Sequence, residues 1–297
     1  MIQSRRGVSL IEMLIAMVVS AGVGAAMMSL LAGSTRFEER AEAQRAARLV
    51  SRSAVNVIVA DLRMVDPSWG VEAATTTSIT VKTPYALGIV CDTGTTAAPT
   101  LTLMFLPVDS LEYSTPGYSG IAWRSTGGLF TAVAGGTLAT LTTAQGQSKC
   151  PTANFPAITA PASAPNQKSI YASVTPTSRT GAPINSVVVL YRRTRFYFAN
   201  STQTGLTTRT ALWRNHLDAA SGAGDATELV APFDATAAFQ FFVSGSSAAS
   251  STIPSPLSTM RGLLLFLPGE SENTARTRST PEESDLTTSV YFFNSSS

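Results

Sequence analysis

One carboxylate stands alone in the most apolar part of this chain. Glu12 is the only charged residue between Arg6 and Arg36, and it lies within a stretch, residues 8–31, that contains no Lys, Arg, Asp or Pro. A helix of that length spans the roughly 30 Å apolar core of a bilayer. Because an ionisable group in a membrane span costs a few kcal/mol, Glu12 is expected to have a function and a positively charged partner.

Two cysteines are the second set of residues that could do chemistry. Cys91 and Cys150 have no Cys-x-x-Cys neighbour, and His216 is the only histidine, so a Cys/His zinc cluster is not available. We expect a disulfide, which would contribute roughly 4 kcal/mol in the chain-entropy model. It requires an oxidising compartment such as the periplasm. Two separate buried thiols are the alternative.

The rest of the chain offers little for catalysis. It contains no Gly-x-Ser-x-Gly, no Gly-rich phosphate loop with Lys and no His-Glu-x-x-His. Residues 218–228 place oxygen-bearing side chains around two glycines, which could hold Ca²⁺, but they lack EF-hand spacing, and a surface loop is the simpler interpretation. We therefore expect no enzyme, no cofactor and no resident metal.

A long helix is predicted to position Glu12. Residues 34–64 contain no Pro and mostly good or neutral helix formers. Apolar residues repeat at helical spacing in the second half: Val50, Ala54, Val57, Ile58 and Leu62. This face should pack on a globular domain. Asp66-Pro67 ends the pattern, because the residue before Pro is pushed out of the α region. The prediction is a continuous helix over residues 8–64, about 85 Å long, whose part 8–31 is the membrane or filament core.

The first residues resemble a known signal. The run Arg6-Gly7-Val8-Ser9-Leu10-Ile11-Glu12 resembles the class III signal of type IV prepilins and pseudopilins: a basic residue, Gly, a hydrophobic first mature residue, then Ser/Thr-Leu-Ile-Glu. The resemblance implies that residues 1–7 are a leader, removed after Gly7 by a membrane-bound prepilin peptidase that methylates the new amino terminus at Val8. Val8 stands where the family usually has Phe. The resemblance also implies that Glu12 pairs with the Val8 amine during assembly, within a chain or between neighbours.

Simpler interpretations of the same segment are open. A secretory signal has an apolar core of about 7–15 residues before its cleavage site, whereas this run is longer and its best cleavage signal precedes it. A plain single-pass anchor would share the Arg5-Arg6 cytoplasmic flank but would have no use for Glu12 or Gly7. Glu12 could also merely reach the cytoplasmic headgroups.

Composition indicates an exported, non-enzymatic protein. Charged residues make up 13% of the chain, and its net charge of +2 falls to zero when Arg5 and Arg6 leave with the leader. No global basic field remains to attract DNA, so no direct nucleic-acid partner is expected.

Residues 65–297 are predicted to form a β-rich extracytoplasmic domain with long loops. Alternating segments predict strands at residues 78–81, 101–105 and 187–198. Ser, Thr, Ala, Gly and Pro predict loops at residues 91–99, 142–167 and 244–256. Residues 270–285 are expected to form a solvated loop between the last two strands. The fold class is therefore α+β, a helical spine packed on an antiparallel β-rich pilin-like domain.

Six C-terminal blocks resemble PilW-type minor pilins and the related J-type minor pseudopilins. They are residues 195–198, 211–214, 228–230, 239–241, 261–267 and 287–294. Each block is first of all sheet core, and Trp213 is expected to be buried packing rather than a ligand platform. Residues 70–186 show no such resemblance.

The resemblance implies a minor pilin at or near the tip of a type IV pilus, which helps to initiate a fibre used in twitching, adhesion or DNA uptake. Its implied partners are the prepilin peptidase, the major and other minor pilins, and the inner-membrane assembly platform. It would sit in the inner membrane with a periplasmic domain before assembly and on the cell surface afterwards. The alternatives are a J-type pseudopilin of a type II secretion system and a single-pass adhesin or binding protein that never polymerises.

Overall fold

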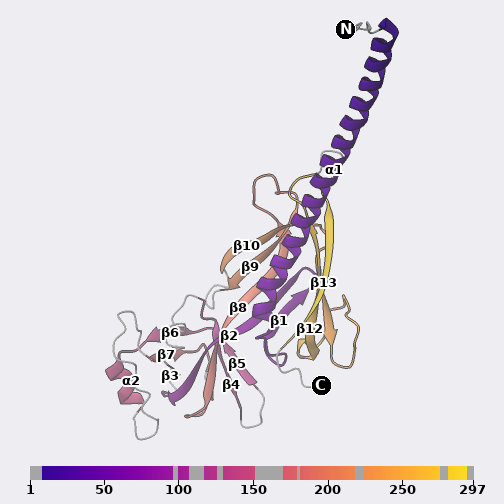
Figure 1. Cartoon of the computed structure of the whole chain (residues 1–297). Helices are drawn as coiled ribbons and strands as arrows, with labels where there is room; N and C mark the ends of the chain where they lie inside the picture. Colours follow the sequence, from indigo (N-terminus) through magenta and orange to yellow (C-terminus); the bar gives the residue numbers. More distant parts are fainter. Residues whose placement is uncertain are drawn as a thin grey trace, which may run out of the picture.

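The computed structural model describes residues 9–95, 100–106, 117–125, 130–150, 170–178, 181–217, 224–274 and 280–292. A single long helix leads into a twisted antiparallel sheet (Figure 1). The predicted α+β class, with a helical spine followed by an antiparallel β-rich domain, is confirmed.

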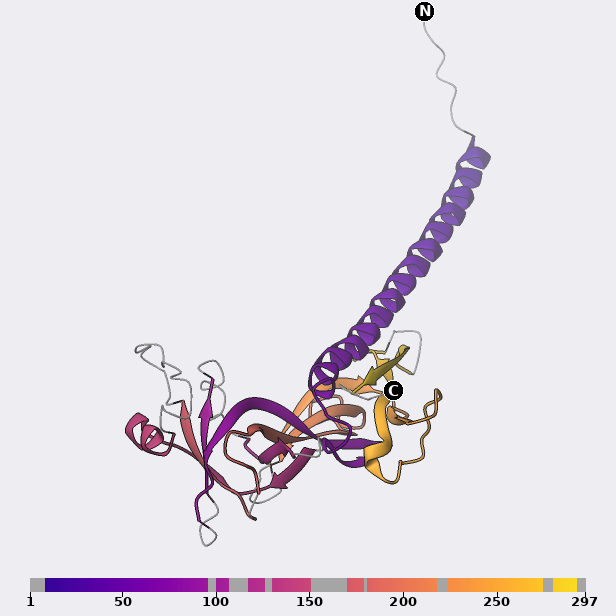
Figure 2. The ribbon, with the colours of Figure 1, turned by 90° about the horizontal axis from the view of Figure 1, so that it is seen from below.

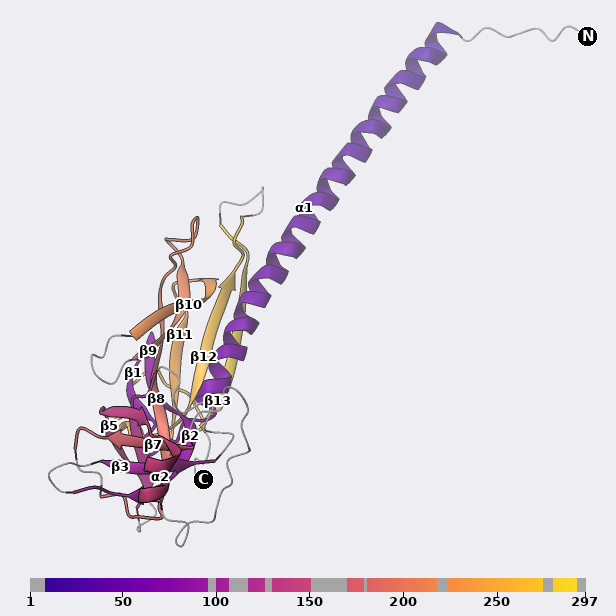
Figure 3. The ribbon, with the colours of Figure 1, turned by 90° about the vertical axis from the view of Figure 1, so that its left-hand side faces the viewer.

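Helix α1 runs over Leu10–Leu62, about 80 Å at 1.5 Å per residue. Its first half projects from the β domain into open space (Figure 3). The prediction of a helix over residues 8–64 is two residues too long at its C-terminal end, because Arg63 caps the helix and Met64 lies in a turn. The Asp66 carboxylate then accepts a hydrogen bond from the Ser68 N–H at 2.8 Å, which fixes the turn at Asp66-Pro67.

The described part of the chain contains one sheet with the strand order β11-β12-β10-β9-β8-β2-β3-β7-β6. Strand β1 pairs with β2, β13 pairs with β12, and the hairpin β4–β5 pairs with β8. The strands are β1 (Val71–Thr75), β2 (Ser78–Asp92), β3 (Leu101–Phe105), β4 (Gly120–Arg124), β5 (Phe130–Ala134), β6 (Thr137–Thr140), β7 (Tyr171–Thr175), β8 (Val187–Asn200), β9 (Thr210–Leu217), β10 (Gly224–Phe233), β11 (Ala238–Val243), β12 (Met260–Glu270) and β13 (Glu283–Tyr291). A short helix α2 (Thr143–Lys149) and a 3-10 turn η2 (Leu257–Thr259) complete the elements.

The sheet has two lobes joined by its two longest strands. The proximal lobe, β9–β13 with the second half of α1, is held together by one apolar core. The distal lobe, β3–β7 with α2, has two smaller cores and lies well to the side of α1 (Figure 2). Strands β2 and β8 pair from Ser78 opposite Tyr197 to Ile89 opposite Val187 and pass through both lobes. Residues 70–186, which showed no family resemblance, supply most of the distal lobe.

The predicted apolar face of the helix packs on the proximal lobe. Ala54, Ile58 and Leu62 are completely buried against β-strand side chains, and Val50 is half-buried against the same core. Val57 is half-buried but is not one of the residues packed on this core. The helix approaches β12 closely because residue 269 is glycine: a Cβ there would lie 2.3 Å from the Ala47 carbonyl oxygen.

Three sequence predictions of strands are confirmed, and two loop predictions are wrong in part, since residues 91–92 belong to β2 and residues 143–149 form a helix. The predicted strands at residues 78–81, 101–105 and 187–198 correspond to β2, β3 and β8, although β2 extends eleven residues further, to Asp92. Residues 143–149 form α2 instead of a loop, because Thr142 and Gln145 make a capping box at its start. Residues 96–99 and 151–167 of the predicted loops lie outside the described residues.

Candidate functional site

Helix α1 begins with a capping box built from Ser9 and Glu12. The Ser9 side chain accepts a hydrogen bond from the Ile11 N–H at 3.3 Å, and Glu12 Oε2 accepts one from the Ser9 N–H at 3.0 Å. These two bonds satisfy amide groups that a helix start leaves without partners. The pattern Ser-x-x-Glu before an apolar run is a recognised signal for this motif. The motif is visible in the sequence as Ser9-Leu10-Ile11-Glu12, but Glu12 was expected to act only as a lone charge in a membrane span.

The capping box points the Glu12 carboxylate back toward the start of the mature chain. The Ser9 nitrogen belongs to the peptide bond with Val8, so the carboxylate is bonded one residue away from the predicted amino terminus. Gly7 and Val8 lie outside the described residues. Cleavage after Gly7, methylation of Val8 and the ion pair between Glu12 and the Val8 amine therefore stay predictions.

The apolar half of α1 has no cover within the described chain. An 18-residue window of this helix has a mean hydropathy of 2.2 and no buried residue, and the helix is long and apolar enough to cross a membrane. Individual side chains are widely exposed, including Leu10 at 83% and Met28 at 74%. So much apolar surface is stable only in a bilayer or against other apolar helices.

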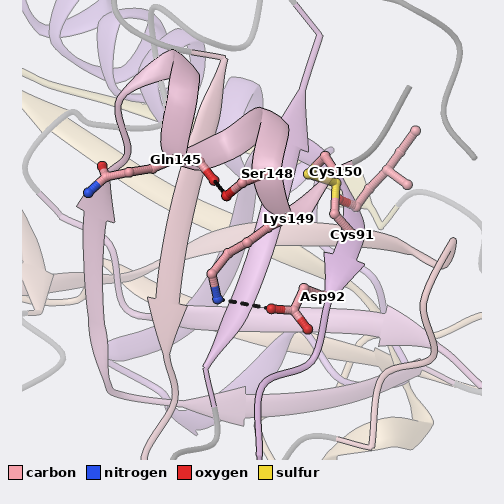
Figure 4. The surroundings of a disulfide bond; sticks show 7 residues. Cys91, Asp92, Gln145, Ser148, Lys149 and Cys150 are labelled. Carbon is pink, nitrogen blue, oxygen red and sulfur yellow. Dashed lines mark hydrogen bonds and ion pairs between the residues drawn. A yellow bond between two sulfur atoms is a disulfide. The ribbon is translucent and has the colours of Figure 1, made fainter. Parts of the chain in front are cut away.

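The predicted disulfide between Cys91 and Cys150 is confirmed. It joins the end of β2 to the residue after α2, with a Cα–Cα distance of 5.0 Å, and both cysteines are buried (Figure 4). Beside it the Lys149 ammonium lies 2.9 Å from the Asp92 carboxylate, and this hydrogen bond holds the pKa of Asp92 below its usual value. The bridge fixes α2 to the distal lobe.

A polar cluster lies where the end of α1 meets the sheet. Burial raises the pKa of Asp61, although the positive charges of Arg214, His216 and Arg192 act in the opposite direction. Burial lowers the pKa of His216, and the neighbouring Arg214 and Arg192 add to this effect. The His216 Nδ1 also lies 3.1 Å from the Thr194 hydroxyl. The only histidine of the chain therefore bridges the paired strands β8 and β9, within electrostatic reach of Asp61 at the end of α1.

The expected surface loop at residues 218–228 is in part a strand. Residues 218–223 lie outside the described residues, and residues 224–228 belong to β10 rather than to a loop. The Glu228 carboxylate accepts hydrogen bonds from Ser201, Thr202 and Gln203 at 2.6–3.0 Å. Glu228 therefore holds the turn after β8, a role that only the pairing of β8, β9 and β10 reveals.

The loop between the last two strands is less solvated than predicted. It connects β12 to β13 as expected, but Glu270, Ser271 and Glu282 at its two ends are buried. Burial raises the pKa of Glu270, and the Arg209 guanidinium, 3.5 Å away, opposes this shift.

Glu270 also belongs to a carboxylate cluster with Asp234 and Glu283, whose oxygens lie within 4.8 Å of one another. Oxygen ligands of this kind suit Ca²⁺. However, Arg209 already supplies a positive charge beside Glu270, and Asp234 accepts two hydrogen bonds from Thr236. These contacts stabilise two of the three carboxylates, while burial and, after it, the charges of Asp234 and Glu283 raise the pKa of Glu270.

Trp213 packs within the sheet. Its ring is half-buried and stacks on Tyr197 of β8, with ring centroids 6.2 Å apart and planes 18° apart. This agrees with the expectation that Trp213 is a packing residue.

Comparison with known families identifies the helix start. Residues 2–29 match the family described as the prokaryotic N-terminal methylation motif. No curated protein and no solved structure matches the chain. With the uncovered apolar helix and the β-rich domain, this motif supports a type IV prepilin-like protein, a pilin or pseudopilin, that is anchored in the membrane by a single span. The motif implies processing by a prepilin peptidase and handling by membrane assembly machinery.

Proposed function

We propose that this chain is a minor pilin that is incorporated at or near the tip of a type IV pilus and helps to initiate pilus assembly. It acts by assembly rather than by catalysis. The observation that carries the proposal is the uncovered apolar half of α1, which starts with the Ser9–Glu12 capping box inside the matched methylation motif. The six C-terminal blocks that resemble PilW-type minor pilins support the finer assignment, because each block contributes to one of the strands β8–β13.

The shape of the β domain favours a position at the end of a fibre. In a repeating wall, every subunit must fit beside identical neighbours on both sides. The distal lobe extends the domain far to one side of α1 (Figure 2), and neighbours on that side would have to leave room for it. A subunit at the tip has no neighbour above it, so no space for the distal lobe is needed there.

The proposed sequence of events follows from the chemistry of the helix start. The subunit waits in the inner membrane with its β domain in the periplasm, where the Cys91–Cys150 bridge forms. Cleavage after Gly7 frees the Val8 amine, whose positive charge offsets Glu12 in the apolar filament core. The apolar half of α1 then binds the other pilins and the assembly platform.

Two other functions compete with this proposal. A J-type minor pseudopilin would share the motif, the helix and the β domain, and would assemble in a type II secretion system. A single-pass adhesin or binding protein would explain the span and the loops, but would leave the methylation motif without a use.

Processing of the amino terminus distinguishes the single-pass adhesin or binding protein from the minor pilin and the minor pseudopilin. We expect mass spectrometry of the membrane-bound protein to show a chain that begins at methylated Val8 in normal cells. In cells without the prepilin peptidase the chain should begin at Met1. A Met1 terminus in both strains, or a cut after Ala25 or Ala32, would contradict the proposed function.

A further inference from the structure

An open groove of about 790 Å³ lies between the middle of α1 and β10. Helix residues 39–53 form one wall, and β10 with residues 270–274 forms the other. The acidic groove, as we call it, is lined by Glu39, Glu42, Ala43, Ala46, Leu49, Val50, Ser53, Gln203, Leu229, Val230, Ala231, Glu270, Ser271, Glu272, Asn273 and Thr274.

The lining defines what the groove can bind. Among the described residues, four glutamates line the groove and no Lys, Arg or His does, so the charged groups in this described lining are all carboxylates. Glu270 is compensated by Arg209, whereas Glu42 and Glu272 are exposed. Apolar side chains lie between these carboxylates, and Leu49 is 62% exposed. A suitable occupant is therefore a surface that offers both positive charge and apolar side chains.

Such a surface exists on the other flank of the same helix. Successive helical residues are separated by about 100° around the axis. Arg45, Arg48 and Arg52 therefore lie within about 60° of one another and about 130° from the middle of the groove wall. All three arginines are exposed. Phe37 is 74% exposed and projects from the helix in nearly the same direction as Arg48. We call these four residues the basic flank.

The two surfaces are arranged so that neighbouring copies can meet. The buried face of α1 (Ala47, Ser51, Ala54) lies about 120° from each of them around the axis, so the groove, whose other wall is β10, lies on one side of that face and the basic flank on the other. Both occupy the same stretch of helix, residues 37–53. Two subunits anchored by the same apolar segment stand at the same height above the membrane, because the bilayer fixes the depth of both.

We propose that the acidic groove of one subunit binds the basic flank of a second copy of this chain. The contact joins two different surfaces of the chain, so it is a heterologous contact between one pair of membrane-anchored copies before assembly. The inference rests on the proposed function in one respect: both copies must be anchored in one membrane as prepilin-type subunits.

Photo-crosslinking in the native membrane tests this contact. One copy of the full chain carries benzoylphenylalanine in place of Leu49, and a second copy carries an epitope tag. We expect a crosslink to the tagged copy that maps to residues 37–52. A link to another part of the tagged copy, or only to a different protein, would overturn the proposal.

Charge reversal tests whether the carboxylates and arginines carry the contact. Glu42→Arg in the first copy, or Arg48→Glu in the tagged copy, should lower the crosslink yield about fivefold, because exposed ion pairs contribute up to about 1 kcal/mol. The two substitutions together should restore it. Glu38→Arg is the matched control, since Glu38 is exposed on the same helix and does not line the groove. An equal loss with Glu38→Arg, or no restoration in the pair, would contradict the inference.

Two controls keep this test independent of folding and of the proposed function. An intact Cys91–Cys150 bridge in each variant shows that the distal lobe has folded, and a thermal unfolding midpoint equal to that of the wild type shows that the proximal lobe has folded. If the chain is recovered in sheared fibres but the crosslink to the tagged copy is absent, the groove contact is wrong and the minor-pilin proposal stands. If the crosslink forms but fibres never contain the chain, the proposed function is wrong and the contact stands.

Discussion

At the scale of single residues, we propose that Glu12 has a different role before and after assembly. In the isolated subunit its carboxylate accepts a hydrogen bond from the Ser9 N–H and completes the start of α1. The proposed cleavage after Gly7 would free the amine of Val8, the residue directly before Ser9, and so place a positive charge near Glu12. A carboxylate in apolar surroundings is costly unless such a charge is near. The ion pair would therefore favour the one axial position of the subunit in the fibre at which an amine lies beside Glu12.

Replacement of Glu12 by valine tests this role. Glu12→Val should leave membrane insertion and leader cleavage intact, because it removes a costly charge from the span. Recovery in sheared fibres should fall about tenfold, since the loss of about 1.4 kcal/mol of assembly energy suffices for that change. Quantitative immunoblots of fibre and membrane fractions measure it. Glu38→Val is the control on the exposed part of α1, and equal recovery of both variants would favour a Glu12 that only reaches the headgroups.

His216, which lies opposite Thr194 across the β8–β9 pair, gives the stability of the sheet a pH dependence whose sign follows from its lowered pKa. Burial and two arginines lower its pKa in the folded protein, so below about pH 6.5 the unfolded chain binds more protons than the folded one. The His216 contribution to stability is therefore present at higher pH and is lost as pH falls through 6.5 toward the folded pKa.

We expect the free energy of unfolding to decrease more in the wild type than in His216→Gln between pH 7.5 and 5.5. Denaturant titrations of the detergent-solubilised chain measure this difference. No other histidine contributes, because His216 is the only one in the chain. Parallel pH profiles of the two proteins would contradict the assignment.

At the scale of elements, the stability of the proximal lobe depends on the close approach of α1 to β12. The Ser51 hydroxyl donates a hydrogen bond to the Leu267 carbonyl at 2.9 Å, and Gly269 lies directly against the helix backbone. No side chain fits between the two elements at residue 269.

Gly269→Ala should therefore separate α1 from β12 and destabilise the proximal lobe by roughly 1–3 kcal/mol, the usual cost of overpacking. Thermal unfolding followed by circular dichroism measures the change. Gly33→Ala is the matched control, because a Cβ at residue 33 meets nothing within 4 Å. Equal midpoints for Gly269→Ala and the wild type would show that the helix contact is looser than described.

The disulfide stabilises the other lobe. Cys91→Ser or Cys150→Ser should lower the stability of the β domain by roughly 4 kcal/mol in the chain-entropy model, without effect on the apolar half of α1. Non-reducing peptide mapping of periplasmically exposed wild-type protein should show the linked peptides. Two thiols that react with an alkylating reagent would contradict the bridge.

The sequence predicts those elements whose signal is local. Ala54, Ile58 and Leu62 recur at helical spacing, and their burial follows from that pattern alone. The full length of β2 does not follow, because Pro84 interrupts the strand pattern and is accommodated only by an irregularity beside β8. Glu228 and the acidic groove were equally out of reach, because their partners lie far away in the sequence.

At the scale of the whole molecule, the chain combines a membrane-spanning helix with a β domain of two lobes. The proximal lobe holds the helix, and the distal lobe carries the disulfide away from it (Figures 1 and 2). The uncovered apolar helix demands a bilayer or a bundle of similar helices. The acidic groove and basic flank offer further contacts just above it.

The measurement that tests the central claim most directly is the composition of sheared surface fibres. We expect mass spectrometry to find this chain there, starting at methylated Val8, in substoichiometric amounts beside a major pilin and other minor pilins. The chain should disappear from that fraction in cells that lack the pilus assembly platform, but not in cells that lack a type II secretion platform. Retention of the processed chain in the membrane fraction, with none in the fibres, would contradict the account.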